Sequence, residues 1–437
     1  MTTVAHSIAW YFPESSGGTE VYLKTLVDHL KKDHDMSSIV VIPVHSTKQI
    51  NTVFENIEVL KIPVSSNSSE KLDLSLFEEC LQAKKVDIYH QHSWTTSCGP
   101  ELLQSAKRLG YKTVLTIHVP GNICLRGTMM KFGKYPCDGK IDLFHCSICL
   151  MNDKGIPSAI AKPLYWSLPV FGIFAKKLPK RIRTLLAIKN IVAQRKEQLR
   201  SVDKVTDKIV AVCEWMSNSL KRNGIDEKKI VFSRQGVETS LVDKKLEIVE
   251  ATPYLKKRLI VGYIGRWTLV KGVHVLVSAI NSLSAQLDIQ LVIYGMIHQK
   301  ADEVYKDMVT SQINSSNIIV NDSVDRQQIK AVLKSFDVLA VPSQWFETGP
   351  LVVLEAQACG IPVVGSNIGG IAELVKHGED GLLIDSANLH AWRQAFTDLV
   401  LKPFLLDDLR KGQRPPKSMK TTASEMNCLY SELMSQQ

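Results

Sequence analysis

Two glutamates in the second half of the chain stand where their carboxylates could recognise a ligand. Glu347 and Glu355 lie eight positions apart in WFETGPLVVLEAQACG, on either side of a Thr-Gly-Pro turn and an apolar run. A hydrophobic core disfavours such groups, because burying a charge without a partner is costly. The simplest explanation is an acid at the start of a helix and a second acid on its solvated face. The alternative is a polar ligand held between them.

The residues between the two glutamates favour a bound phosphate. Pro350 suits the first turn of a helix, since it lacks the N–H that would have no partner there, and the preceding threonine or glycine can cap that helix. Glu355 then lies roughly 7 to 8 Å further along the helix axis. The free N–H groups near Gly349 and Leu351, with the positive end of the helix dipole, form an anion site. Acid, anion site and acid match the sugar hydroxyls, diphosphate and ribose hydroxyls of a nucleotide sugar.

Two cations follow a predicted strand in GYIGRWTLVKG and strengthen this interpretation. Arg266 and Lys271 stand beside Gly265 and Gly272. They can reach a diphosphate from the opposite side, the arginine as a two-pronged donor and the lysine as a point charge. Either residue alone is more often a surface cation. Together with the glutamates they predict a diphosphate site.

The elements that must position these residues alternate between strand and helix in both halves of the chain. Short uncharged runs rich in β-branched residues predict buried parallel strands, and amphipathic runs between them predict helices. The predicted strands cover residues 4–12, 38–44, 86–92, 113–119 and 208–214, and then 258–266, 289–295, 336–343 and 361–367. This pattern predicts an α/β protein with two doubly wound sheets, each with helices on both faces. Two such domains facing across a cleft would bind a ligand where the carboxyl ends of both sheets meet.

Length and composition agree with two soluble domains. The chain has 437 residues, of which 45% are hydrophobic, so it is too long for one ordinary core. Its first residues lack the features of a signal peptide, and no uncharged apolar stretch reaches the roughly 20 residues of a spanning helix. We therefore expect a cytoplasmic protein.

Several motifs in the same order give the chain a family resemblance. The motifs are SGGTE, VDIYHQHS, GRWTLVKG, ETGPLVVLE, DVLAVPS and GIPVVGSNIGGIAELVKHGEDGLLI. With them the chain resembles the family 4 retaining glycosyltransferases of GT-B fold, which have two Rossmann-like domains. The resemblance implies transfer of a sugar from a nucleoside-diphosphate sugar to an acceptor hydroxyl, in the biosynthesis of a cell-surface glycan or glycolipid.

The resemblance also suggests how the chain is divided. Residues 1–245 would form the acceptor domain, with a cysteine-rich insertion at about 119–155 and a basic apolar segment at about 156–200. Residues 246–400 would form the donor domain, and residues 401–437 a helical tail that packs back toward the first domain. The polar stretch at 243–257 is the expected linker.

The resemblance assigns roles to the residues of the donor domain. Arg266 and Lys271 would hold the diphosphate and offset the charge that develops on the leaving nucleotide. Glu347 would accept from hydroxyls of the donor sugar, and Glu355 from the ribose. The backbone at the start of the helix would meet the phosphate, through Gly349, Pro350 and Leu351.

Further roles fall in the first domain. Gly17 and Gly18 would form a loop that closes over the donor, although an ordinary turn before a helix explains them equally well. His118, at the end of TVLTIH, would face the sugar. His90 and His92 alternate along one strand and so share a face, which suits a structural or acceptor-side role. No carboxylate nucleophile stands out, so the resemblance favours front-side attack, with the leaving phosphate taking the acceptor proton. Without an Asp-x-Asp motif, no catalytic metal is expected.

A second set of residues could bind a metal. Cys124, Cys137, Cys146 and Cys149 lie within 26 residues, the last two as C-x-x-C. Four thiolates in a reducing compartment suit a structural zinc ion, which would shape the acceptor pocket. An iron–sulfur cluster, a redox disulfide and simple burial are the alternatives.

A basic segment follows the cysteines. Lys162 to Arg200 contains ten Lys and Arg residues against one acid, Glu197, and begins with the apolar run PLYWSLPVFGIF. This composition suits an anionic membrane surface, at the inner face of the membrane, or a lipid diphosphate acceptor. A solvated basic helix is an equally good explanation. Nucleic acid is disfavoured, because no recognition fold accompanies the charges.

Three functions are compatible with these residues and motifs. The first is a glycosyltransferase acting on a glycan, glycolipid or small-molecule acceptor. The second is a nucleotide-sugar epimerase of the same fold, which needs no acceptor groove. The third is a non-catalytic, zinc-containing binding protein with a basic surface.

Overall fold

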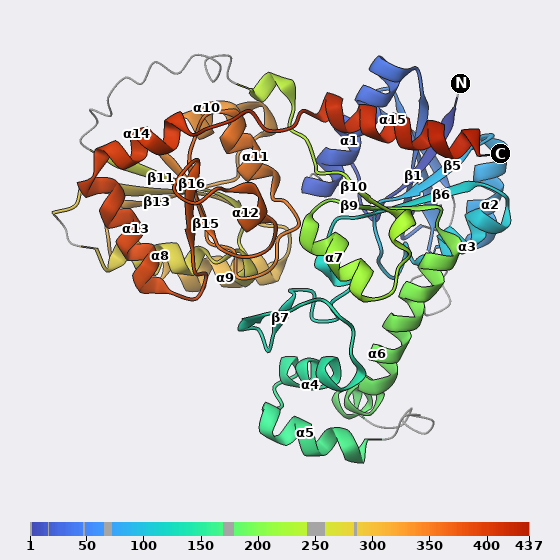
Figure 1. Ribbon diagram of the computed structural model, residues 1–437, viewed down its shortest axis with the longest axis horizontal. Coiled ribbons are helices and arrows are strands. Elements are labelled where there is room, and N and C mark those ends of the chain that lie inside the picture. The colour runs from blue at the N-terminus through green and yellow to red at the C-terminus, as the bar shows by residue number, and fades with distance from the viewer. Residues whose placement is uncertain are drawn as a thin grey trace. The chain divides into compact units, whose positions relative to one another are not determined.

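The computed structural model of the protein describes residues 2–15, 17–46, 49–64, 72–168, 179–242, 258–283 and 286–436. It forms two compact units (Figure 1). Unit 1 consists of Met1–Arg234 and Met419–Gln437, and unit 2 of Gln235–Ser418.

Both boundaries differ from those expected from the sequence. The first lies after residue 234 rather than 245, and the chain returns to unit 1 at residue 419 rather than 401. Helix α14 (Pro403–Lys411) stays in unit 2 because Leu406 and Leu409 pack into its core and Arg410 pairs with the buried Asp337. The expected linker, residues 243–257, lies outside the described residues.

Unit 1 is built on one sheet in the order β10-β9-β6-β5-β1-β2-β4-β3. The strands are β1 (Thr3–Ser7), β2 (Ser37–Val44), β3 (Ile50–Phe54), β4 (Ile57–Pro63), β5 (Ile88–Gln91), β6 (Lys112–Ile117), β9 (Lys208–Ala211) and β10 (Ile230–Phe232). Neighbouring strands are parallel except β3 and β4. The chain builds the sheet first to one side of β1 and then, from β5, to the other. The topological switch point therefore lies between β1 and β5.

Helices cover both faces of this sheet. Apolar side chains of α2 (Leu74–Ala83), α3 (Pro100–Arg108), α6 (Lys180–Val205) and α7 (Glu214–Arg222) share one core with the sheet. Those of α1 (Gly18–His34) and α15 (Met419–Ser435) form a core on the other face. The last helix of the chain is therefore an integral part of unit 1.

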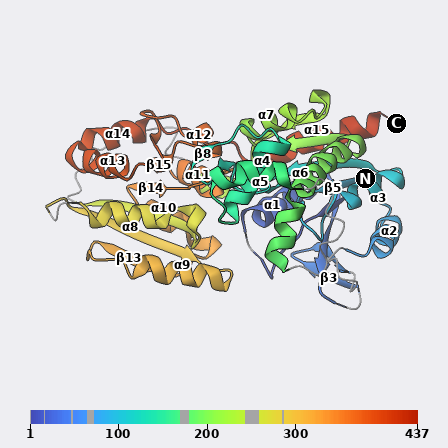
Figure 2. The same ribbon diagram turned by 90° about the horizontal axis from the view of Figure 1, so that it is seen from below.

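An insertion follows β6 and has a small core of its own. It contains a 3-10 turn, η1 (Pro120–Asn122), strands β7 (Met130–Lys131) and β8 (Tyr135–Pro136), and helices α4 (Leu143–Asp153) and α5 (Ser158–Ser167). Helices α4, α5 and the start of α6 pack together (Figures 1 and 2), and Figure 1 shows them extending away from the sheet. No helix in the described ranges is both long and apolar enough to cross a membrane.

Unit 2 has a fully parallel sheet in the order β13-β12-β11-β14-β15-β16. The strands are β11 (Leu259–Arg266), β12 (Ile289–Met296), β13 (Ile318–Asn321), β14 (Val338–Val341), β15 (Val363–Ser366) and β16 (Gly381–Ile384). Helices α8 (Val273–Asn281), α9 (Lys300–Thr310), α13 (Leu389–Leu401) and α14 share one core. Helices α10 (Ile329–Lys334), α11 (Leu351–Ala358) and α12 (Gly369–Leu374) share the other. Here the switch point lies between β11 and β14, where such sheets bind ligands.

Candidate functional site

The predicted donor residues of unit 2 gather at its switch point. Arg266 is the last residue of β11, and Lys271 ends the 3-10 turn η6 (Leu269–Lys271) that follows. The adjacent strand β14 leads through residues 342–350 into α11, and this loop carries Glu347. Because the carboxyl ends of parallel neighbours share one edge of a sheet, residues far apart in sequence come together there.

Glu347 is buried and accepts three hydrogen bonds on one oxygen. Its Oε1 lies 2.7 Å from Lys271 Nζ, and it also accepts from Ser343 Oγ and from the indole N–H of Trp345, each at 2.8 Å. A buried carboxylate is stable when it is paired and hydrogen-bonded in this way. Lys271 remains one-quarter exposed, so its ammonium group is held in place and is still accessible.

Glycines bring the two segments close enough for this pair. Gly272 has a φ of 74°, and a Cβ there would lie 2.0 Å from the carbonyl oxygen of Pro342. Gly370 donates its N–H to the carbonyl of Glu347 at 2.6 Å, and a Cβ on Gly370 would overlap the backbone of Thr348. Only a residue without a side chain permits such approaches. The loop that carries Glu347 is thus held from two sides.

Arg266 borders the same edge. Its side chain is 42% exposed, and Nη2 lies 3.5 Å from Oδ2 of the buried Asp302. Asp302 also accepts the backbone N–H of His298 at 2.9 Å. The contact with Asp302 is long, so the arginine keeps exposed donors that can meet an anion.

Glu355 lies in α11, where it is buried, and it pairs with Arg326 from the turn before α10. The predicted capping of this helix by Thr348 or Gly349 is wrong. Pro350 itself is the N-cap, with extended backbone, and Leu351 is the first helical residue. The proline ring fixes φ near its observed −65° and disfavours a helical conformation at the residue before it, so Gly349 stays outside the helix.

The switch point of unit 1 is lined with histidines. His6 on β1 and His92, just after β5, are joined by a 3.1 Å hydrogen bond between Nδ1 and Nε2. The other nitrogen of His92 lies 3.3 Å from Nε2 of His118, which follows β6. His90 shares the face of His92, as predicted, with ring centroids 4.0 Å apart. His90 bonds to Thr116 at 2.7 Å and to the hydroxyl of Tyr430 at 2.5 Å.

Burial keeps these imidazoles neutral. It lowers the pKa of His6 and of His118 to about 3. Burial, and to a lesser degree the neighbouring histidines, also lowers the pKa of His90 and His92 well below 6.5. A hydrogen bond between two imidazoles needs one nitrogen with a proton and one without, which neutral rings provide. The cluster therefore presents His118 as a neutral, oriented ring.

Comparison with known proteins supports an assignment for the second half of the chain. Residues 244–414 match the family model described as glycosyl transferases group 1. A D-inositol 3-phosphate glycosyltransferase of Corynebacterium glutamicum (strain R) is 30% identical over 187 residues, which cover 40% of this chain and 43% of that protein. The corresponding protein of Arthrobacter sp. (strain FB24) is 26% identical over 270 residues, or 57% and 63% of the two chains. The chain thus matches about half the length of these relatives.

Residues 244–414 form a glycosyl transferases group 1 domain. Solved structures extend the likeness to the whole chain. Sucrose-phosphate synthase from Thermosynechococcus elongatus has a TM-score of 0.66 at 15% identity, with complete coverage of both chains. Anabaena Alr3699/HepE in complex with UDP and glucose has a TM-score of 0.64 at 13% identity, covering 99% and 100%. At this identity the likeness concerns the fold, which is GT-B, as expected from the sequence.

Outside the group 1 domain, the predicted glycine pair lies at the start of α1. Gly17 is the N-cap, with extended backbone, and Gly18 is the first helical residue. A Cβ on Gly17 would lie 2.7 Å from a carboxylate oxygen of Glu20, which itself accepts from Ser15 Oγ at 2.9 Å. The pair therefore forms a tight entry to the helix, and its predicted role in closing over a donor stays a prediction.

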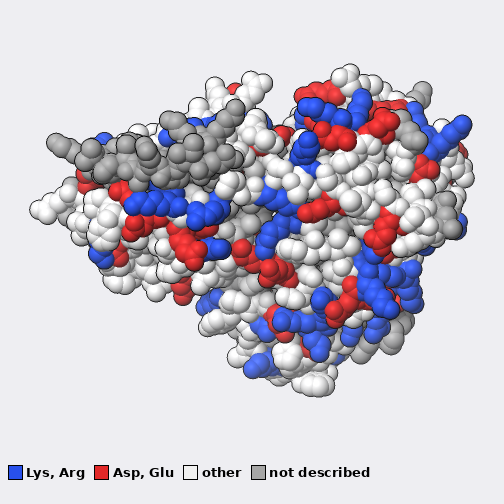
Figure 3. All heavy atoms as spheres, turned by 45° about the horizontal axis from the view of Figure 1, so that its top comes forward, with Lys and Arg blue, Asp and Glu red and all other residues white. Residues whose placement is uncertain are grey.

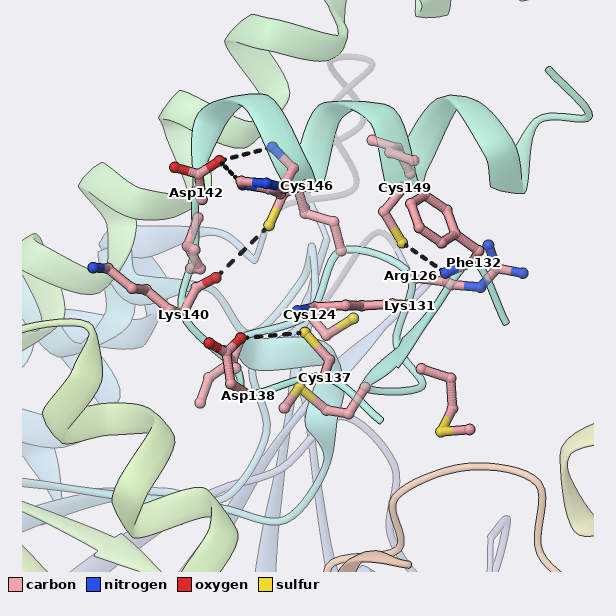
Figure 4. A pocket seen from close by; sticks show the side chains of 18 residues that line it. Cys124, Arg126, Lys131, Phe132, Cys137, Asp138, Lys140, Asp142, Cys146 and Cys149 are labelled. Atoms are coloured by element: carbon pink, nitrogen blue, oxygen red, sulfur yellow. Dashed lines mark hydrogen bonds and ion pairs between the residues drawn. The ribbon is translucent and has the colours of Figure 1, made fainter. Parts of the chain in front are cut away.

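The four predicted metal ligands also come together, in the insertion. They line one cavity, with Cys124 and Cys137 in the loops and Cys146 and Cys149 on one face of α4 (Figure 4). Sequence spacing alone indicated this cluster, since residues three apart on a helix share a face.

Several residues of the two sites were not predicted. In the group 1 domain they are Asp302, Arg326, Ser343, Trp345 and Gly370, and in unit 1 they are His6, Thr116 and Tyr430. Ser343 and Trp345 lie close to Glu347 in sequence, and this closeness could have identified them as its hydrogen-bond partners. Arg326 and Tyr430 lie 29 and 340 positions from their partners, and no local pattern links them.

Proposed function

We propose that this protein is a retaining glycosyltransferase that moves a sugar from a nucleoside-diphosphate sugar to an acceptor hydroxyl. The observation that carries the proposal is the Lys271–Glu347 pair, with Arg266 beside it, at the switch point of a group 1 domain. Cations at the carboxyl edge of a doubly wound sheet, next to the N-terminus of α11, suit a diphosphate.

The donor contacts follow from this arrangement. The start of α11, at Gly349 to Leu351, would meet the phosphates, and Arg266 and Lys271 would approach them from β11. Glu347 would accept from sugar hydroxyls through the oxygen that does not face Lys271, and Glu355 from the ribose. Solved structures of similar fold were determined with UDP and with UDP-glucose, which makes UDP-glucose the first donor to test.

The charged groups also have a role in the chemical step. Transfer breaks the bond between C1 of the sugar and the diphosphate oxygen and forms a bond from C1 to the acceptor oxygen. The acceptor attacks the face of C1 from which the phosphate departs, and its proton passes to that phosphate, so the configuration at C1 is retained. Lys271 and Arg266 stabilise the negative charge that grows on the diphosphate, and Glu347 keeps the ammonium in position beforehand.

Donor binding can be tested directly. Calorimetry with UDP and UDP-glucose on the full chain should give a saturable signal, and a bound donor should raise the melting temperature. Lys271→Ala should weaken binding of UDP. Lys376→Ala is the matched control, because Lys376 and its partner Glu379 are both exposed. If a panel of nucleoside-diphosphate sugars leaves the wild-type melting temperature unchanged, the proposal fails.

Product analysis separates the competing activities. NMR of the incubated donor distinguishes transfer, hydrolysis and epimerisation, and the anomeric coupling of a transferred sugar reports retention. An epimerised nucleotide sugar without transfer to any acceptor would support the epimerase instead. Binding without turnover would support the non-catalytic alternative.

We further propose that the acceptor is a glycolipid at an anionic membrane surface on the cytoplasmic side. In the basic segment, Ile160, Trp166 and Ile182 are exposed by 57%, 76% and 47%, and Arg183 is exposed nearby. Residues 169–178, which include part of the predicted lipid-binding run, lie outside the described residues. Aromatic and aliphatic groups beside cations favour an interfacial location. On the face shown in Figure 3, basic and acidic groups are interspersed, which disfavours a nucleic-acid surface.

Vesicle flotation tests this acceptor proposal. Binding should require anionic lipid, weaken as salt rises, and fall in Trp166→Ser. Absence of binding to anionic vesicles at low salt would favour a soluble acceptor and leave the donor assignment intact.

A further inference from the structure

The cysteines of the insertion surround a cavity of about 370 Å³. Figure 4 shows the sulfurs of Cys146 and Cys149 directed from α4 toward those of Cys124 and Cys137 on the opposite wall. The remaining lining is largely apolar and includes Ile123, Leu125, Met129, Met130, Phe132 and Ile141. Four thiols thus converge on one cavity from two sides.

The sulfurs are spaced more widely than a bound zinc ion would hold them. Bonds of about 2.3 Å to a tetrahedral zinc ion place the four sulfurs only about 3.8 Å apart. Among the residues described, His6, His90 and His92 form a group of three ligand atoms within 4.8 Å of one another, whereas no three of these cysteines do. A cubane cluster separates its four cysteine sulfurs further, because iron and sulfide atoms lie between them.

We propose that Cys124, Cys137, Cys146 and Cys149 bind one [4Fe–4S] cluster, which links the loops of the insertion to α4. The cluster is structural and takes no part in sugar transfer. Zinc, which the sequence favours, is the competing outcome of the test.

A backbone amide supports the bound form of Cys149. The N–H of Phe132 lies 3.4 Å from the sulfur of Cys149. Hydrogen bonds of this kind stabilise thiolates and tune iron–sulfur clusters.

The charges around the cavity are compatible with an anionic centre. A cubane in its 2+ state with four thiolate ligands carries two negative charges. Arg126, Lys131 and Lys140 line the cavity, and Arg195 is close enough to interact with Cys124. Asp138 and Asp142 also face this region, and Asp142 caps α4 and accepts from His145.

The insertion also needs a cross-link. Strands β7 and β8 have two residues each, and the separate core around α4 and α5 contains few buried side chains. A two-stranded hairpin is marginal by itself, and small cores are usually reinforced by disulfides or metals. A cluster joining residue 124, residue 137 and α4 would fix the hairpin on the helix.

Anaerobic purification of the full chain tests the proposal. We expect about four iron and four acid-labile sulfide atoms per chain, broad visible absorption that bleaches with dithionite, and a Mössbauer spectrum typical of a cubane. Protein that has lost iron in air is first reconstituted with ferrous iron and sulfide. One zinc per chain without iron, or no metal after reconstitution, overturns the proposal.

Variants locate the site. Cys137→Ala and Cys146→Ala should lose the iron and become sensitive to proteolysis between residues 124 and 153. Cys428→Ala is the matched control, because this free cysteine is exposed on α15, and it should retain the full cluster. UDP binding by the variants checks that the rest of the chain is folded, since the proposed donor residues lie in unit 2. Full iron content in Cys137→Ala and Cys146→Ala would also contradict the assignment.

Discussion

Each of the two sheets has one topological switch point. The side chains that line the switch point are charged in unit 2 and neutral in unit 1. In unit 2 the edge between β11 and β14 carries Arg266, Lys271 and Glu347, all charged. In unit 1 the edge between β1 and β5 carries His6 and His92, which burial keeps neutral. The same topology therefore provides one site with fixed charges and one with hydrogen bonds only.

This difference suits a division of labour in the proposed reaction. Charge that develops on a diphosphate is stabilised by fixed cations, so these belong beside the leaving group. A neutral imidazole can hydrogen-bond a sugar hydroxyl without adding a charge that would oppose an oxocarbenium-like transition state. Substitutions at the charged edge of unit 2 should therefore reduce activity more than substitutions of the neutral histidines in unit 1.

The largest effect is expected at the charged edge. Lys271→Ala removes the cation that is proposed to face the leaving diphosphate, and it leaves the buried Glu347 without its ion pair. We expect kcat/KM to fall by about 100- to 1000-fold, as for other groups that stabilise developing charge. Steady-state kinetics with the identified donor measure this, and Lys376→Ala should behave as wild type. A loss below about tenfold would remove Lys271 from the proposed mechanism.

The next largest effect is expected for the stability of a variant at Gly272, the glycine that positions Lys271. Gly272→Ala places a side chain on a residue whose φ is positive, and its Cβ would lie 2.0 Å from the Pro342 carbonyl oxygen. The substitution should therefore lower the free energy of unfolding by about 2–4 kcal/mol. Gly378→Ala is the matched control, with a φ of 81° and no atom near its Cβ, and should cost about 1 kcal/mol. Chemical denaturation compares them. Equal losses would mean that the approach to Pro342 does not matter.

The sequence predicts the residues of these two edges where a local pattern identifies them, and it misses the contacts that join distant parts of the chain. The strands were predictable because buried parallel strands are uncharged and rich in β-branched residues, as in LIVGYIG before Arg266. Lys271 and Glu347 follow such strands, so their type and position were enough to predict the diphosphate site that is proposed here. The GT-B fold expected from the motifs is confirmed by the structural comparisons.

The partners of these residues were beyond sequence reasoning. Arg326 reaches Glu355 only because α10 and α11 pack on the same face of the sheet. His6 meets the other histidines because the parallel register aligns it with His90 on β5. Tyr430 reaches His90 because the last helix returns to unit 1. Each contact is set by strand order or helix docking, which a single sequence does not encode locally.

The neutral edge should make stability sensitive to acid. The folded-state pKa of His6 and of His118, about 3, lies below the value of about 6.5 in the unfolded chain. Between these values the unfolded chain binds protons that the folded chain does not, so stability falls as pH decreases from about 6.5. Each such histidine should contribute about 1.4 kcal/mol per pH unit. Urea denaturation from pH 7.5 to 5 measures the slope, and His118→Gln should reduce it.

Activity should depend on the His118 ring and not on its ionisation. His118→Ala should lower kcat/KM by about tenfold, the value of one neutral hydrogen bond, and His118→Asn should recover part of that loss by restoring a donor. Burial holds the pKa of His118 at about 3. The pH profile of wild-type kcat/KM should therefore contain no ionisation step near pH 6.5 that is missing from the profile of His118→Asn. Such a step would show a titrating, charged His118 and would erase the contrast between the two edges.

The last effect concerns the side chains that support the histidines. The buried Tyr430 hydroxyl lies 2.5 Å from Nδ1 of His90, whose other nitrogen is bonded to Thr116. Tyr430→Phe keeps the packing of α15 but leaves Nδ1 of His90 without that partner in a buried site, which should cost about 1–2 kcal/mol. Tyr135→Phe is the control, since Tyr135 is 64% exposed, and should leave stability unchanged. If Tyr430→Phe is as stable as wild type, the Tyr430 hydroxyl does not hold the histidines, and their orientation must come from the sheet alone.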